Sequence, residues 1–193
     1  MKICVVQTRP IKGDIQGNIV AHQRLVERAA AYGAETVIFP ELSLTGYEPT
    51  LAQALATHQD DARLDRLQKT ADCRQMTIGV GLPTVNEPLP SISMVIFQPN
   101  QPRQLYSKQF LHGDEEPFFT SGPRSAGLVG RSPQVALAIC YELSVAAHAA
   151  QAVAKGADLC ISVAKSARWG EPGGYTAQQM LPAIMGCGAD EQL

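Results

Sequence analysis

Hydrophobic positions follow two spacings along this chain, and the two alternate from one segment to the next. Short continuous apolar runs, typical of buried strands, occupy 3–7, 36–39, 77–82, 91–97, 104–107, 126–129, 135–139 and 159–163. Apolar residues three and four positions apart, typical of helices, recur over 18–32, 60–74 and 145–155, and a loose pattern over 48–59 predicts a loop and a short helix. We expect Asn18 and Ser144 to cap the first and last long helices, and Gly33 to end the first.

The order of these elements predicts a mixed α/β fold. Helices between strands early and late in the chain imply parallel pairing inside a covered sheet. The strands 91–97 and 104–107 are joined by Pro99-Asn100-Gln101-Pro102, which predicts an antiparallel hairpin. The number of strands indicates two mixed sheets packed together, with helices outside. A length of 193 residues suits a single domain.

Composition and charge exclude several classes of function. The net charge is −2 and no cluster of Lys or Arg occurs, so we expect no nucleic-acid partner. No apolar run reaches the length of a membrane span, and the N-terminus lacks the layout of a signal peptide. The five cysteines are widely spread and form no Cys-x-x-Cys pair, which fits a reducing cytoplasm and argues against a zinc site and a disulfide framework.

Three polar residues stand where apolar strands end. Glu41 follows the strand 36–39, Lys108 the strand 104–107, and Cys140 the strand 135–139. Loops at strand ends are where α/β sheets gather their sites. A thiol, a carboxylate and an ammonium suit acyl transfer: the thiol attacks a carbonyl carbon, the carboxylate takes the proton and the ammonium stabilises the oxyanion. The start of the last helix should favour the thiolate of Cys140 through its dipole.

Each of these residues also has a purely structural interpretation. Cys140 could be a small buried residue that closes a strand. Glu41 could be an exposed loop residue and Lys108 a solvated strand end. Composition and spacing alone do not decide between these interpretations.

Three motifs resemble the nitrilase superfamily of carbon–nitrogen hydrolases in their order and separation. They are Phe39-Pro40-Glu41 with Gly46-Tyr47 downstream, Tyr106-Ser107-Lys108 followed by Leu111, and Ile139-Cys140-Tyr141-Glu142. The resemblance covers residues 1–167. It implies a nitrilase-like α-β-β-α sandwich and a catalytic triad of Glu41, Lys108 and Cys140, with no metal and no cofactor.

The resemblance also implies substrate-binding residues. The family has a second glutamate before a Phe-x-x-Gly, and counting back from Gly122 favours Glu115 over Glu116, although both could belong to a solvated acidic loop. Tyr47 and Tyr141 complete the expected set. Nitrilases tend to carry Trp where this chain has Tyr141, so we expect a small amide or N-carbamoyl substrate rather than a nitrile.

The C-terminal segment departs from the family pattern. Residues 168–193 contain five glycines and two prolines and do not resemble the closing elements of the family. We therefore expect a carbon–nitrogen hydrolase domain over 1–167, an atypical and disordered tail over 168–193, and a sandwich that is incomplete at its C-terminal end. The apolar sheet surface left uncovered would favour a homo-oligomer.

Two alternative functions stay open. The chain could be a catalytically silent or regulatory relative that binds without turnover, because the closing elements are missing. It could also be a nucleotide-binding α/β protein with Gly79-Val80-Gly81-Leu82-Pro83-Thr84 as its phosphate loop, although the third glycine is absent and Pro83 suits the start of the following helix poorly.

Overall fold

The strands and helices predicted from the sequence are present, with small differences in their boundaries. The computed structural model describes residues 1–125, 127–130 and 133–164, so the predicted tail 168–193 lies outside the described residues. The strands are β1 (Ile3–Val5), β2 (Thr36–Ile38), β3 (Thr77–Thr84), β4 (Ser91–Phe97), β5 (Gln104–Ser107), β6 (Leu128–Val129), β7 (Val135–Ile139) and β8 (Leu159–Val163). The helices are α1 (Ile15–Ala31), α2 (Ala52–Leu55), α3 (Asp65–Arg74) and α4 (Ala146–Ala154), and the 3₁₀ helices are η1 (Pro49–Leu51), η2 (Ala62–Leu64) and η3 (Cys140–Ser144).

The strands form two mixed sheets. The first has the order β1-β2-β3-β4-β5, in which β1, β2 and β3 are parallel and β3, β4 and β5 are antiparallel neighbours. The second has the order β6-β7-β8, with β6 antiparallel and β8 parallel to β7. The predicted crossovers and the predicted hairpin between β4 and β5 are therefore both confirmed.

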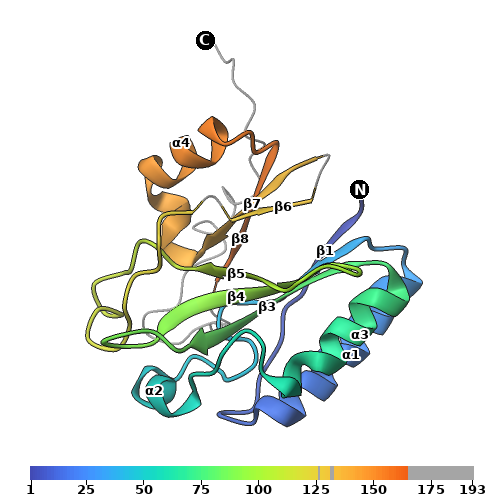
Figure 1. The fold of residues 1–193 in the computed structure, drawn as a ribbon, viewed down its shortest axis with the longest axis horizontal. Coiled ribbons are helices and arrows are strands. Elements are labelled where there is room, and N and C mark those ends of the chain that lie inside the picture. The colour runs from blue at the N-terminus through green and yellow to red at the C-terminus, as the bar shows by residue number, and fades with distance from the viewer. Residues whose placement is uncertain (126, 131–132, 165–193) are drawn as a thin grey trace.

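The elements stack in four layers. Figure 1 shows α1 and α3 together on the outer face of the five-stranded sheet, and α4 beyond the β6-β7-β8 sheet. Alternate residues of β7 serve two different cores: Leu137 and Ile139 pack in the cluster between the sheets, whereas Ala136 packs with Ala152 and Ala157 under α4. This is the expected nitrilase-like α-β-β-α arrangement. No helix in the described ranges is long and apolar enough to span a bilayer.

The glycine-containing segment that could have been a phosphate loop is part of a strand. Gly79 to Thr84 lie inside β3 and pair with β4 along their whole length. A phosphate loop needs a turn that leads into a helix N-terminus. The nucleotide-binding alternative is therefore excluded at this segment.

The first helix begins three residues before Asn18, so the predicted cap is wrong. Asp14 is the cap, because its carboxylate accepts a hydrogen bond from the backbone N–H of Gly17 at 2.9 Å. The buried side chain of Asn18 instead bonds to the backbone of Ile11 at 2.8 Å and of Leu44 at 2.9 Å. Asn18 therefore makes tertiary hydrogen bonds instead of the predicted helix cap.

A buried histidine joins α1 to the turn after β2. His22 stacks on Phe39 with 4.0 Å between ring centroids, and its Nε2 lies 3.0 Å from the hydroxyl oxygen of Ser43. Its Nδ1 lies 2.7 Å from the carbonyl oxygen of Asn18. Burial lowers the pKa of His22 to about 4, although the bond to Asn18 acts in the opposite direction. The neutral ring therefore donates to Asn18 and accepts from Ser43.

His22 should make the protein less stable as the pH falls. The unfolded chain protonates this histidine near its ordinary pKa of 6.5 and the folded chain only near 4, so the unfolded state binds more protons between these values. We expect the free energy of unfolding to lose about 3 kcal/mol across this range. Urea denaturation at pH 7 and pH 4.5 measures the loss, and His22→Gln should reduce it.

His58→Gln is the matched control, because His58 is exposed. The free energy of unfolding of His58→Gln should depend on pH in the same way as that of the wild-type protein. An equal pH dependence in the wild-type protein and in His22→Gln would contradict the assignment.

Candidate active site

Two of the three predicted polar residues, Glu41 and Lys108, meet a second carboxylate, that of Glu115, in the interior. Lys108 directly follows β5, and its backbone N–H continues the ladder to Ile92 of β4 at 2.8 Å. The ammonium of Lys108 donates to Oε1 of Glu41 at 2.9 Å and to Oε1 of Glu115 at 2.7 Å. The side chains of these three residues are at most 3% exposed. Glu116, the other candidate, is exposed.

The two carboxylates fix the charge of Lys108. Burial lowers the pKa of the Lys108 ammonium, but the charges of Glu41 and Glu115 and the hydrogen bond to Glu115 raise it, and the net pKa lies above the ordinary value. Lys108 therefore stays protonated at neutral pH. It can donate hydrogen bonds and stabilise an anion, but it cannot act as a base.

The turn that carries Glu41 is packed directly on β3. Leu42 has a φ of +52°, in the left-handed region. Gly81 of β3 donates its backbone N–H to the hydroxyl oxygen of Ser43 at 3.2 Å. A Cβ atom at position 81 would lie 2.4 Å from the nitrogen of Leu42 and 2.5 Å from the carbonyl oxygen of Pro40. Only glycine leaves room for this turn.

Glu115 is held by the loop that it belongs to. Its Oε2 accepts a hydrogen bond from the backbone N–H of His112 at 2.8 Å. The hydroxyl of the half-buried Tyr47 lies 3.5 Å from Oε1, at the limit of hydrogen bonding. Burial raises the pKa of Tyr47, and the charges of Glu115 and Glu41 raise it further. Tyr47 is therefore a neutral phenol that can donate toward the carboxylates.

Cys140 stands at the sharp turn where β7 ends and the 3₁₀ helix η3 begins. Its φ of +50° is in the left-handed region, which is costly for a residue other than glycine and is common at functional sites. The thiol is half-buried and packs on the cluster between the sheets. A negative charge on Cys140 raises the pKa of the Lys108 ammonium and of the Tyr47 phenol. The sulfur is therefore close enough to both groups to interact with them electrostatically.

The predicted helix cap next to Cys140 is wrong. Cys140 is the first of the five residues of η3, Val145 is extended with φ −95° and ψ 104°, and α4 begins only at Ala146. The hydroxyl of Ser144 donates to the carbonyl oxygen of Tyr141 at 2.7 Å and caps no helix. The predicted helix-dipole effect on Cys140 therefore lacks its geometric basis, because the dipole acts within the first turn of a helix.

Tyr141 lies at the rim of this group of residues. It is 39% exposed and meets the ring of His112 edge-on, with 5.4 Å between centroids. His112 in turn contacts Asp114 at 2.5 Å. The structure thus places Tyr141 beside the loop that holds Glu115.

Glu142 is the residue that the sequence reasoning missed. It is fully buried, and its carboxylate accepts hydrogen bonds from Gln109, Ile139 and Tyr106. The sequence does contain a signal for such a residue, namely a charged residue close to an apolar strand. A carboxylate that is buried there must find hydrogen-bond donors. Tyr106 and Gln109 lie in a segment far away in the sequence, which the sequence alone does not connect to Glu142.

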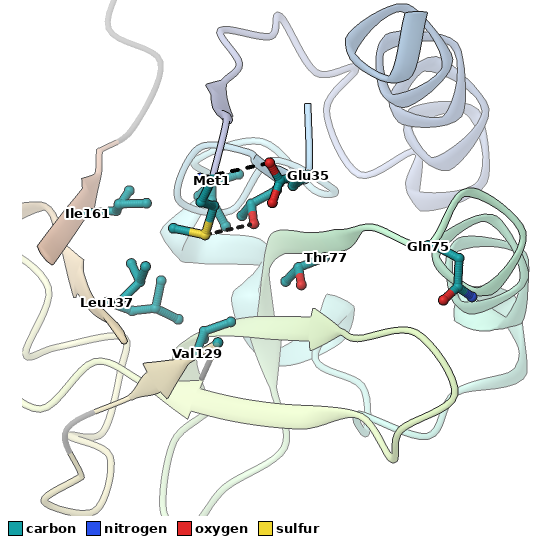
Figure 2. A pocket seen from close by; sticks show the side chains of 11 residues that line it. Met1, Glu35, Gln75, Thr77, Val129, Leu137 and Ile161 are labelled. Atoms are coloured by element: carbon teal, nitrogen blue, oxygen red, sulfur yellow. Dashed lines mark hydrogen bonds and ion pairs between the residues drawn. The ribbon is translucent and has the colours of Figure 1, made fainter. Parts of the chain in front are cut away.

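A separate cavity lies between the two sheets, away from these residues. Its volume is about 200 Å³, and Figure 2 shows Val129, Leu137 and Ile161 on one side with Met1 and Glu35 on the other. It contains none of the candidate catalytic side chains. Within the described ranges, no group of three or more His, Cys, Asp or Glu side chains is arranged to hold a metal ion.

Comparison with models of protein families shows which family this chain belongs to. A model of the carbon-nitrogen hydrolase family matches residues 2–187. The chain belongs to the carbon-nitrogen hydrolase family. This confirms the resemblance seen in the sequence motifs. A search of curated proteins finds no match for this chain.

Solved structures of amidases share the fold of this family member. The NitN amidase from Nesterenkonia sp. AN1 is 25% identical with a TM-score of 0.76, over 85% of this chain and 66% of that chain. A cysteine-to-serine mutant of the Nesterenkonia AN1 amidase, described as a member of the nitrilase superfamily, gives 25% and 0.76 over 85% and 65%. A further mutant, with acrylamide added to the active-site cysteine, gives 25% and 0.76 over 85% and 66%. The chain therefore spans slightly less than two thirds of these relatives.

Gly81→Ala should destabilise the protein by displacing the turn that carries Glu41. The added methyl group would meet backbone atoms rather than a flexible side chain, so neither partner can move cheaply. Overpacking of this kind costs about 1–3 kcal/mol in the free energy of unfolding. Urea denaturation measures the cost.

Gly113→Ala is the matched control, because a Cβ atom at Gly113 would have no neighbour within 4 Å. It should change the free energy of unfolding by less than about 0.5 kcal/mol. Equal stability of the two variants would contradict the proposed close contact.

Proposed function

We propose that this carbon-nitrogen hydrolase cleaves a non-peptide C–N bond of a small amide or N-carbamoyl compound through a thioester on Cys140. The observation that carries the proposal is the buried Lys108 ammonium, which is held between Glu41 and Glu115 within electrostatic reach of the Cys140 thiol. A nucleophile, a base and a cationic hydrogen-bond donor are the groups that acyl transfer requires.

The proposed roles follow from the charge of each group. Cys140 attacks the carbonyl carbon, and Glu41 accepts the thiol proton and passes it to the leaving nitrogen. Lys108 remains cationic and donates a hydrogen bond to the oxyanion. Water then attacks the thioester with Glu41 as its base, which releases the acid and restores the thiol. In this scheme Glu115 holds Lys108 in place, and no metal or cofactor takes part.

The comparisons support the substrate class as an inference. The similar structures are described as amidases, and in one of them acrylamide has added to the active-site cysteine. By analogy we assign that role to Cys140. Tyr141, which stands next to the proposed nucleophile where nitrilases tend to carry Trp, supports binding of an amide or carbamoyl group in preference to a nitrile. Tyr47, near Glu115, is a further proposed substrate-binding residue.

We also propose that the domain over 1–167 forms a homo-oligomer in the cytoplasm. The helix α4 carries no charged residue, and its alanines at 147 and 150 are exposed together with Val153. Such a face favours contact with a second copy.

The proposed chemistry predicts an acyl adduct on Cys140. Incubation with a panel of small amides and N-carbamoyl compounds, followed by mass spectrometry, should detect it for the compounds that are hydrolysed. Cys140→Ala should lose turnover entirely, because no other group forms the thioester. Lys108→Met should lower kcat on the order of 10²–10³-fold, since it removes the oxyanion donor.

Lys69→Met is the matched control, because Lys69 is an exposed lysine on α3. It should hydrolyse substrate like the wild-type protein. If Cys140 reacts with a fluorescent thiol reagent at neutral pH no faster than the exposed Cys73, and no amide is hydrolysed, the result would favour the silent relative.

The oligomer has its own test. Light scattering should give a mass that is a multiple of 20.7 kDa, and Val153→Lys should lower it by placing a charge on the apolar face. Tyr32→Lys, at the exposed end of α1, should leave it unchanged. A mass of 20.7 kDa for the wild-type protein at all concentrations would contradict the proposal.

A further inference from the structure

One carboxylate connects the two chain segments that carry Lys108 and Cys140. The side chain of Glu142 is fully buried. Its Oε1 accepts a hydrogen bond at 2.6 Å from the backbone N–H of Gln109, the residue directly after Lys108. Its Oε2 accepts a hydrogen bond at 2.8 Å from the backbone N–H of Ile139, the residue directly before Cys140.

Further donors complete the environment of this carboxylate. The hydroxyl of Tyr106 donates to Oε2 of Glu142 at 2.7 Å, and the backbone N–H of Phe110 lies 3.3 Å from Oε1. Nε2 of His148 lies 2.8 Å from the Tyr106 oxygen. Because the only hydroxyl hydrogen of Tyr106 goes to Glu142, the hydrogen of this last bond comes from His148. Four donors can satisfy a buried carboxylate.

The two connected segments belong to different sheets. Lys108 directly follows β5 of the five-stranded sheet, and Cys140 directly follows β7 of the β6-β7-β8 sheet. The hydrogen bonds within each sheet therefore do not set the separation of the ammonium and the thiol. The hydrogen bonds of Glu142 reach both segments, and the bond to Ile139 lies directly beside the left-handed turn at Cys140.

We propose that Glu142 is a positioning residue that fixes Cys140 relative to Lys108 without contacting the substrate. The proposal rests on the proposed function of those two residues. A glutamate suits the role because each of its two oxygens accepts two hydrogen bonds. Glutamine would present an amide N–H₂ to donors on one side, and aspartate is one methylene shorter.

The test compares Glu142→Gln with the wild-type protein in three measurements. Hydrogen exchange should become faster at the amides of Gln109 and Ile139. Turnover should fall on the order of 10²-fold in kcat with little change in KM, as for a displacement of about 1 Å. Acrylamide addition to Cys140 should slow by a similar factor, because negative charge develops on the carboxamide oxygen that Lys108 would stabilise.

A second thiol reagent separates positioning from general loosening. The bulky disulfide reagent DTNB reports access to the thiol, so its rate with Cys140 should stay the same or rise in Glu142→Gln. Glu116→Gln is the matched control, because Glu116 is an exposed glutamate in the same loop as Glu115. It should behave like the wild-type protein in every measurement.

Tyr106→Phe keeps the test decisive if Glu142→Gln does not fold. It removes one of the four donors and should slow acrylamide addition about fivefold, as expected for one hydrogen bond. An unchanged acrylamide rate in that variant would overturn the proposal. So would a folded Glu142→Gln with wild-type exchange or wild-type acrylamide addition.

Failure of the proposed function has a different signature. In that case the wild-type protein hydrolyses none of the amides. The hydrogen-exchange and thiol-addition rates of the variants can still be compared with those of the wild-type protein.

Discussion

The ion cluster of Lys108 with Glu41 and Glu115 constrains the rest of this structure. An ammonium taken out of water costs several kcal/mol, and two carboxylates at 2.9 and 2.7 Å offset that cost only while both stay in place. Removal of one partner would leave a buried charge without compensation. The segment after β2, the end of β5 and the loop at Glu115 must therefore converge on one point, and the five-stranded sheet supplies the frame that holds them.

Each part of the fold around this cluster fixes one of its members. Gly81 lets the Glu41 turn lie against β3, and His22 orients Ser43 in the same turn. The second sheet brings Cys140, which is tied to the first sheet through the carboxylate of Glu142. The proposed chemistry thus depends on contacts between layers as much as on the residues that would touch the substrate.

Much of this could be predicted from the sequence, and the failures share a physical cause. Periodicity located the elements, and strand ends singled out Glu41, Lys108 and Cys140, because both signals are local. The predicted caps at Asn18 and Ser144 were wrong, since tertiary hydrogen bonds and the left-handed turn at Cys140 override local capping preferences. Likewise, the roles of Gly81 and Glu142 depend on partners far away in the chain.

A crystal structure of Cys140→Ala with bound propionamide tests the central claim most directly. The account predicts that the carboxamide oxygen lies within about 3 Å of the Lys108 ammonium, at hydrogen-bond distance. Its carbonyl carbon should face the place where the sulfur of Cys140 would stand, with Glu41 and Glu115 still bonded to Lys108. An amide bound elsewhere, or a Lys108 side chain directed away from both carboxylates, would contradict it.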